Sequence, residues 1–309
     1  MRFVTRLAMC VALVPSLLAA AQLPVPPDRS LGWVTAEVKA PRVAFRTFPS
    51  AVLGAKVSYH VYTPPAYDKL GARLPVLYWL HGTNGGIEGI QLLAKFFDEA
   101  MQLGRAPAML VVFVNGLPRS LWADSKDGAA PVETAFIKEV ITDVDRTFRT
   151  VASREGRILE GFSMGGYGAA RLGFKYPQLF AGISILAGGP FDLELEGPRA
   201  LQSPILRERV LREVCGNDLE YFKAISPLTL ADQASAALRD EHVVIRQAVG
   251  EEDDTRELNR LFHDRMTELN IAHEYYEVPR ARHEALALLK ALASDNGGFY
   301  RRALGLVEH

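Results

Sequence analysis

Cysteine is almost absent from this chain of 309 residues, which contains only Cys10 and Cys215. A small domain held together by a framework of disulfides is therefore excluded. An excess of one charge is missing too, since 35 Lys and Arg residues face 36 Asp and Glu residues. We therefore expect neither nucleic acid nor an anionic membrane surface as a partner. Stability must come from a large hydrophobic core, which the 49% apolar composition can supply.

Long hydrophobic runs are also missing, except near the N-terminus. Two arginines precede an apolar stretch over residues 7–21 that ends in three alanines. The stretch is shorter than the roughly 20 residues of a membrane-spanning helix, and its pattern is typical of a secretory signal peptide cleaved near Ala21. We expect a secreted or periplasmic protein made of residues 22–309, with no membrane attachment after cleavage. Cleavage would remove Cys10 and change the formal net charge from −1 to −3.

Short apolar runs alternate with helical patterns along most of the chain. Such runs fit strands covered on both faces of a parallel sheet, with helices between them. The runs are residues 76–80, 109–114, 158–159, 183–186 and 243–249, and the helical patterns are residues 131–148, 167–175, 255–269 and 284–292. Earlier, residues 57–62 alternate apolar and polar side chains, as an antiparallel edge strand does. We predict one α/β domain with a mostly parallel central sheet, an antiparallel N-terminal edge and helices on both faces.

Residues 190–240 interrupt this alternation with mixed helical pieces and several prolines. We interpret them as an insertion over the edge where the parallel strands end. Ligands bind at that edge in open α/β sheets. The insertion either caps a site there or packs without contacting a ligand, and both alternatives stay open.

One serine stands where a strand is expected to turn into a helix, in the sequence Gly161-Phe-Ser163-Met-Gly165. Glycines two residues before and after it let strand and helix pass close together, and the tight turn exposes the hydroxyl. This is the Gly-x-Ser-x-Gly nucleophile elbow. Such a serine needs a histidine to take its proton and a carboxylate to orient that histidine. In folds with this elbow, acid and histidine follow the serine in the chain.

His283 is the best candidate for the base. It follows an expected strand at residues 274–278 and precedes a helix, so it lies at a strand end after the serine. The other histidines have structural explanations: a place in or next to a strand, in a helix, or at the chain terminus. They are His60, His81, His242, His263, His273 and His309.

The acid must come from a loop in which four carboxylates follow the strand at residues 243–249. We choose Asp253 and keep Glu252 as the alternative. Asp254 or Thr255 is expected to cap the next helix. The loop lacks the ligand spacing of a calcium site, so we expect no metal and no cofactor.

Acyl transfer also needs donors for the oxyanion that develops on the carbonyl. One is expected from the backbone N–H of Met164, directly after the nucleophile. The second should come from the loop at residues 81–86, His-Gly-Thr-Asn-Gly-Gly, where Thr83 and Gly82 are the candidates. A phosphate-binding role for this loop is disfavoured because no Gly-Lys-Ser/Thr follows.

Two residues after the strand at 109–114 are candidates for substrate contact. Asn115 and Trp122 lie at the same sheet edge as the elbow. Trp122 would stack on a sugar or an aromatic acyl group. Packing beneath its own loop is an equally good explanation.

Taken together, these motifs resemble the putative esterase family, which groups esterase D, S-formylglutathione hydrolases, feruloyl and acetylxylan esterases, and mycolyltransferases. The resemblance covers about residues 45–292, and the matching segments are residues 76–82, 143–149, 161–168, 176–180, 226–229, 250–253 and His283. It implies an α/β-hydrolase fold with Ser163 as nucleophile, Asp253 as acid and His283 as base. The chain departs from the family at Arg280 and Arg282, where relatives usually have glycines. These arginines either change the charge of the pocket or point to solvent.

The expected function is that of an exported serine carboxylesterase that forms an acyl-enzyme. A small-molecule or polysaccharide ester is the expected substrate, possible classes being feruloyl esters and acetylated xylan. The alternatives are a thioesterase similar to S-formylglutathione hydrolase, which the expected export disfavours, an acyltransferase, and a non-catalytic binding protein with this fold. The sequence leaves the oligomeric state open.

Overall fold

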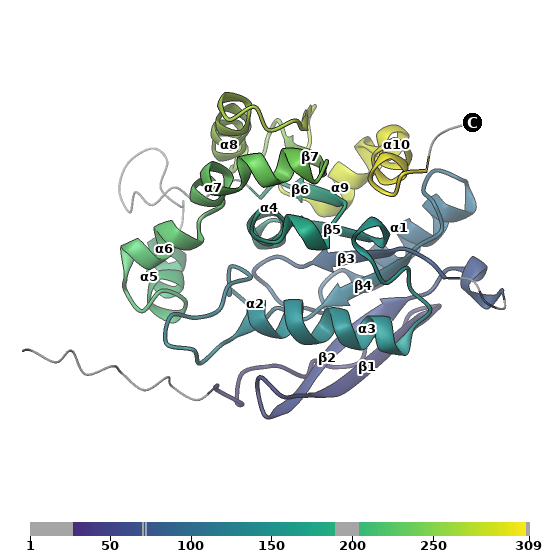
Figure 1. Cartoon of the computed structure of the whole chain (residues 1–309), viewed down its shortest axis with the longest axis horizontal. Coiled ribbons are helices and arrows are strands. Elements are labelled where there is room, and N and C mark those ends of the chain that lie inside the picture. The colour runs from purple at the N-terminus through teal and green to yellow at the C-terminus, as the bar shows by residue number, and fades with distance from the viewer. Residues whose placement is uncertain (1–26, 70, 72, 189–203, 307–309) are drawn as a thin grey trace, which may run out of the picture.

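The computed structural model describes residues 27–69, 71, 73–188 and 204–306. The expected signal peptide, Cys10 and His309 lie outside this part of the chain. Within it, an eight-stranded sheet forms the centre of the molecule (Figure 1). The strands are β1 (Val43–Ser50), β2 (Ala55–Tyr62), β3 (Val76–Leu80), β4 (Leu110–Val114), β5 (Arg157–Phe162), β6 (Gly182–Leu186), β7 (Val244–Gly250) and β8 (Glu274–Val278).

The strand order is β1-β2-β4-β3-β5-β6-β7-β8. The β1–β2 and β2–β4 pairs are antiparallel, and every other pair is parallel. Strands β3, β4 and β6 are buried at every position, which explains their continuous apolar sequences because both faces of a parallel sheet are covered. The predicted fold, with its antiparallel N-terminal edge, is confirmed.

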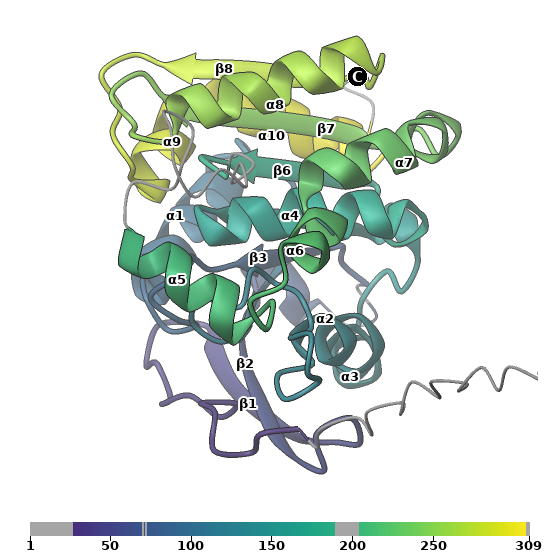
Figure 2. The same cartoon turned by 90° about the vertical axis from the view of Figure 1, so that its left-hand side faces the viewer.

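Helices cover the two faces of the sheet (Figure 2). One face carries α1 (Ile90–Gln102), α9 (Ala285–Ala291) and α10 (Ala293–Ala303). The other carries α2 (Val132–Ala135), which continues through a π-helical turn (Phe136–Val140) into α3 (Ile141–Thr147), together with α4 (Met164–Lys175), α7 (Pro227–Asp240) and α8 (Arg256–Glu268). Alternate side chains of β3 belong to two different core layers. Tyr78 and Leu80 pack on the α4 side of the sheet, and Leu77 and Trp79 pack on the α1 side.

Two of these helices, α1 and α10, were not identified from the sequence pattern. Helix α10 contains Gly297 and Gly298, which favour turns and cost helix stability. Its next residues, Phe299 and Tyr300, are completely buried. Tertiary burial of these two rings therefore outweighs the weak local preference for a helix.

The segment predicted as an insertion contributes α5 (Pro204–Glu213), α6 (Leu219–Ile225) and α7 to the described structure. Helix α7 packs along α4, the helix that follows the elbow, and the Tyr167 hydroxyl of α4 donates to Ile225 O at 3.5 Å. Residues 189–203 lie outside the described part. That the segment covers the carboxyl edge of the sheet therefore stays a prediction.

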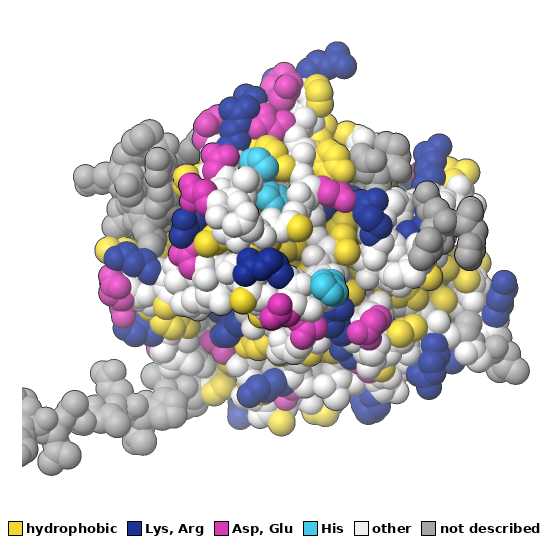
Figure 3. Space-filling model, turned by 45° about the horizontal axis from the view of Figure 1, so that its top comes forward, with side chains coloured by type: hydrophobic (Ala, Val, Ile, Leu, Met, Phe, Trp, Pro, Cys, Tyr) yellow, Lys and Arg dark blue, Asp and Glu magenta, His cyan; other side chains and the backbone are white. Residues whose placement is uncertain are grey.

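Acidic and basic side chains are interspersed over the face shown in Figure 3, with apolar side chains between them. Within the described residues, none of the helices combines the length and apolar composition that crossing a membrane requires.

Candidate active site

Ser163 occupies the turn between β5 and α4, with backbone angles φ 58° and ψ −123°. A non-glycine residue rarely adopts positive φ, and such strain persists only where the surroundings impose it. Here strand and helix pass so close that a methyl group on Gly161 would overlap the Gly165 carbonyl, and one on Gly165 would overlap the Leu80 carbonyl. The glycines of the elbow therefore have the steric role that the motif predicts.

Three predicted residues form one chain of hydrogen bonds. The Nε2 atom of His283 lies 2.9 Å from the Ser163 hydroxyl oxygen, and its Nδ1 atom lies 2.8 Å from Oδ2 of Asp253. Because an ionised carboxylate only accepts, Nδ1 carries the proton and Nε2 is free to accept the serine proton. The geometry is that of a nucleophile, a base and an orienting acid.

Both carboxylate oxygens of Asp253 are held by hydrogen bonds. The backbone N–H and the hydroxyl of Thr255 both donate to Oδ1 at 2.7 Å, which leaves Oδ2 for His283. Burial raises the pKa of Asp253, but the hydrogen bonds from His283 and Thr255 outweigh it and lower the pKa below its ordinary value. The carboxylate is thus kept ionised next to the imidazole.

The alternative acid, Glu252, does not contact His283. Its carboxylate pairs with Arg282 at 3.1 Å on the surface. Thr255 lies at the N-cap position of α8, one of the two residues expected there. Its side chain makes no capping hydrogen bond and donates to Asp253 instead.

The loops after β7 and β8 are held together by their backbones. Glu251 N–H donates to Val278 O and Glu252 N–H to Ala281 O, both at 2.9 Å. A methyl group on Gly250 would overlap the Ala281 carbonyl. This close approach places the acid of one loop opposite the histidine of the other.

Neither of the two arginines before His283 lines the cavity at Ser163. Arg282 has 75% of its side chain exposed and pairs with Glu252. Arg280 is also exposed and has positive φ, 57°. The structure favours the solvent-facing alternative for both.

The predicted oxyanion donors lie close to Ser163. Among the described residues, the backbone hydrogen bonds of α4 begin at Tyr167, whose N–H donates to Ser163 O at 3.0 Å. The N–H of Met164 is therefore one of the donors that a helix N-terminus leaves unpaired. On the other side, a methyl group on Gly82 would lie 3.4 Å from Ser163 Cβ, and Gly82 and Thr83 both line the cavity.

A cavity of about 440 Å³ opens beside Ser163 and His283. Its apolar wall comes from Trp79, Leu93, Phe162 and Leu286, and Phe162 also packs on the His283 ring with centroids 4.6 Å apart. These pocket residues were missed by the sequence analysis. Their only signal was position, since Trp79 and Phe162 stand at the ends of the strands that lead into the oxyanion loop and the elbow.

The substrate role predicted for Trp122 is wrong. Trp122 has no exposed surface and fills the space left by Gly116 and Gly168, where a methyl group would overlap its ring. Packing beneath the loop, the other explanation, is what the structure shows. Asn115 also lies outside the cavity walls, and its amide donates to Gly32 O at 2.8 Å and Trp33 O at 3.0 Å, so it anchors the N-terminal segment.

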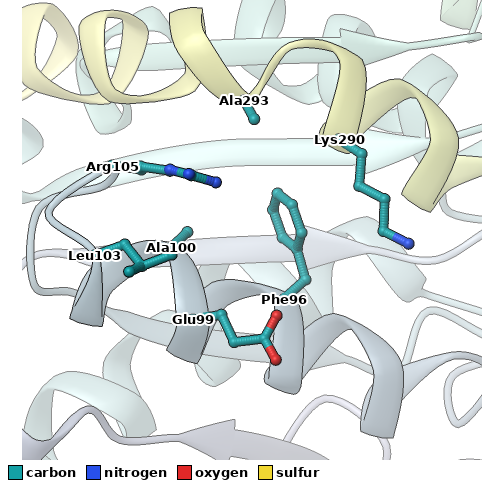
Figure 4. Close-up of a pocket in the computed structure, with 7 residues that line it drawn as sticks. All are labelled: Phe96, Glu99, Ala100, Leu103, Arg105, Lys290 and Ala293. Carbon is teal, nitrogen blue, oxygen red and sulfur yellow. The ribbon is translucent and has the colours of Figure 1, made fainter.

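A second cavity, of about 270 Å³, lies between α1 and the α9–α10 segment and shares no residue with the first. Phe96 projects into this space from α1, with Arg105 and Lys290 at its sides (Figure 4). Its walls hold no serine, histidine or cysteine, so it lacks the groups for acyl transfer. As for metals, the described part of the chain contains no group of three or more His, Cys, Asp or Glu side chains placed to hold an ion.

The strand order, the strained elbow and the Ser163–His283–Asp253 geometry define an α/β-hydrolase fold with a serine triad. Comparison with protein families matches residues 50–287 to the family described as "Putative esterase". This match covers most of the chain, so the protein belongs to that family, as the motifs predicted.

Individual relatives agree with this assignment. The chain is 30% identical over 168 residues to an endo-1,4-beta-xylanase/feruloyl esterase of Xylanibacter ruminicola, over 50% of this chain but only 23% of that protein. A ferulic acid esterase structure matches with a TM-score of 0.69 at 20% identity, over 84% of this chain and 98% of that one. An S-formylglutathione hydrolase of Agrobacterium tumefaciens also matches with a TM-score of 0.69, at 18% identity over 85% and 95% of the two chains. At these identities the structural matches establish the fold.

Proposed function

We propose that this protein is an exported serine carboxylesterase that works through an acyl-enzyme. The observation that carries the proposal is the unbroken hydrogen-bond chain from Ser163 through His283 to the buried Asp253. Family membership supports it.

In the first step, His283 Nε2 takes the proton from the Ser163 hydroxyl while Oγ attacks the carbonyl carbon of the ester. The carbonyl electrons move to oxygen, and the N–H groups of Met164 and Thr83 stabilise that oxyanion. When the tetrahedral intermediate collapses, the C–O bond to the alcohol breaks and His283 gives its proton to the leaving oxygen. An acyl-enzyme and a free alcohol result.

In the second step, His283 takes a proton from water, whose oxygen attacks the acyl carbon. Collapse of this intermediate returns the proton to Ser163 and releases the carboxylic acid. Asp253 stays ionised throughout and stabilises the imidazolium that forms twice per turnover. The residues of this chain thus supply every proton transfer.

The cavity favours esters with a neutral, partly apolar acyl group. Its wall is aromatic and aliphatic, and among its described lining residues the carboxylates are Glu88 and Glu284, with no Lys or Arg. S-formylglutathione bears two carboxylates and one ammonium group, so its net negative charge has the same sign as these two glutamates. Feruloyl and acetyl esters are uncharged and fit this wall, and the X. ruminicola relative is named a feruloyl esterase.

Substitution of the nucleophile tests the proposal directly. Ser163→Ala should lower kcat on a short activated ester at least about 10⁴-fold, because the acyl-enzyme can no longer form. A fluorophosphonate probe should label wild type and not the variant. Wild-type hydrolysis by Ser163→Ala would show that the nucleophile is elsewhere. A wild-type protein that neither hydrolyses esters nor is labelled would favour a binding protein, whereas ester formed with a sugar acceptor would favour an acyltransferase.

Export is a separate part of the proposal and rests on the sequence of residues 1–21. The mature protein recovered from outside the cytoplasm should begin close to Gln22, which N-terminal sequencing measures. Recovery of a full-length chain from the cytoplasm alone would contradict it.

A further inference from the structure

His81 is a buried histidine beside the active site, and the mechanism above does not use it. It is the first residue after β3 and has only 5% of its surface exposed. Both ring nitrogens are engaged. Nδ1 lies 2.6 Å from Gly82 O, and Nε2 lies 3.0 Å from the backbone nitrogen of Gly116.

These two contacts determine where the His81 proton lies. The Gly116 N–H can only donate, so Nε2 must be the unprotonated, accepting nitrogen. The proton of the neutral ring is therefore on Nδ1, and Nδ1–H donates to the Gly82 carbonyl. Burial lowers the pKa of His81 to about 4, so the neutral ring with this tautomer persists at neutral pH.

The Gly82 carbonyl belongs to the same peptide unit as the Thr83 N–H. In a trans peptide the C=O and the N–H point in opposite directions, and the described residues contain no cis bond. His81 draws the carbonyl toward the buried side of the loop. The N–H of Thr83 is consequently turned away from His81, and Thr83 lines the cavity beside Ser163.

We propose that His81 is a positioning residue that orients the Gly82–Thr83 peptide so that the Thr83 N–H faces the oxyanion. The inference rests on the proposed function, because it concerns the second donor of that reaction. It goes further by assigning a role in transition-state stabilisation to the His81 side chain, which acts through the Gly82–Thr83 peptide.

A second contact holds the preceding peptide. The indole N–H of Trp122 donates to His81 O at 3.2 Å, and the His81 and Trp122 rings lie 5.0 Å apart. Arg171 of α4 in turn donates to Trp122 O at 3.0 Å. The loop after β3 is thus fixed to the loop after β4 and to the helix that starts at the nucleophile. Such support is what a preorganised oxyanion site needs.

Two substitutions separate the two contacts of His81. In His81→Asn the amide nitrogen takes the place of Nδ1 and can still donate to Gly82 O. In His81→Gln the amide oxygen takes the place of Nε2 and can still accept from Gly116 N–H, while the contact with Gly82 O is lost. Removing an oxyanion donor costs about 10²–10³ in kcat. A donor that is only misoriented should cost about 10- to 100-fold.

The experiment measures kcat and KM on a short activated ester, together with the phosphonylation rate of Ser163 by a fluorophosphonate. We expect His81→Gln to lose about 10- to 100-fold in kcat and in phosphonylation rate with KM nearly unchanged, and His81→Asn to retain at least about ten times the kcat of His81→Gln. Active-site titration corrects both variants for folded enzyme. Wild-type kcat in His81→Gln, or equal losses in both variants, would overturn the inference.

The chain offers a matched control in His60. It is also buried, and its Nε2 also accepts a backbone N–H, from Val38 at 3.0 Å, but it lies in β2 outside the active site. His60→Gln should change stability without changing kcat. Ser163→Ala separates the two proposals: an inactive Ser163→Ala beside a fully active His81→Gln removes the role of His81 and leaves the esterase proposal standing.

Discussion

Two carboxylates of the central sheet and its loops each face a basic side chain, and only one of these two pairs can exchange protons with a substrate. Asp253 and His283 meet at the carboxyl edge, in the loops after β7 and β8. Glu160 of β5 and Arg246 of β7 face each other within the sheet, 3.5 Å apart. The two bases differ, since a guanidinium stays protonated whereas an imidazole can give up its proton near neutral pH, and the surroundings of the pairs differ too.

The two pairs differ in how much of their side-chain surface is exposed to solvent. The His283 side chain is 38% exposed, whereas the Asp253 side chain has no exposed surface. The imidazole is therefore accessible from the cavity and is held in place by a buried carboxylate. Glu160 and Arg246 are both 0% exposed. Tyr300 donates to Glu160 at 2.8 Å, Arg246 donates to Ser184 at 3.0 Å, and the guanidinium lies 4.3 Å over the Phe299 ring.

The pKa shifts of the two carboxylates run in opposite directions. Hydrogen bonds lower the pKa of Asp253 despite its burial. Burial raises the pKa of Glu160, and Arg246 and Tyr300 only partly offset it. The carboxylate–imidazole pair at the loop edge is thus placed for proton transfer, whereas the carboxylate–guanidinium pair enclosed in the sheet is an element of structure.

The largest expected effect concerns the acid of the first pair. Asp253→Asn should lower kcat about 10³- to 10⁴-fold, because the amide no longer holds the imidazole in the required tautomer or stabilises its charge. Glu252→Gln, one residue earlier, is the matched control and should stay within about twofold of wild type. Comparable losses in both variants would mean that the loop carries no single acid.

Substitution in the buried pair of Glu160 and Arg246 should change the stability of the protein and not its activity. Glu160→Gln removes the carboxylate that faces the Arg246 charge, so the free energy of unfolding should fall by about 3–5 kcal/mol. Denaturant unfolding measures this, and kcat per folded molecule should change less than about threefold. The double variant Glu160→Gln/Arg246→Met should recover part of the loss. A large loss of kcat in folded Glu160→Gln would break the distinction between the pairs.

A third basic group, His81, is buried as well, and its effect can be measured through the pH dependence of stability. Its pKa is about 4 in the fold against an ordinary value of about 6.5 in the unfolded chain. Between these pH values only the unfolded chain takes up the proton, so stability is lost as the pH falls through this window. Wild type should therefore lose about 1–2 kcal/mol more than His81→Gln between pH 7 and pH 5. Parallel stability curves for the two proteins would exclude a buried neutral His81.

The smallest effect is expected from an exposed pair, Arg282 and Glu252, with side chains 75% and 49% exposed. Solvent screens such a pair, so Arg282→Ala should change the free energy of unfolding by less than about 0.5 kcal/mol. Thermal unfolding measures the difference. A loss above about 1.5 kcal/mol would mean that the loops after β7 and β8 depend on this contact.

Much of the fold could be predicted because its signals are local. Apolar runs mark β3, β4 and β6. The alternating sequence of residues 57–62 predicted the strand β2, but these residues are all buried, because β2 lies between β1 and β4 and not at the edge of the sheet. Helix α10 could not be predicted, since its stability comes from rings buried against distant strands. Trp122 shows the same limit, because its neighbours Gly116 and Gly168 belong to segments far apart in the chain.

By itself, the sequence determined the elbow and the order of serine, acidic loop and histidine, because glycine spacing and strand-end positions are local properties. The tertiary structure decided which of four carboxylates faces His283, since that depends on how the loops after β7 and β8 meet. It also decided the role available to His81. That histidine has a structural explanation in the sequence, and only the tertiary structure shows its contacts with Gly82 O and the Gly116 N–H, on which the proposed positioning role rests.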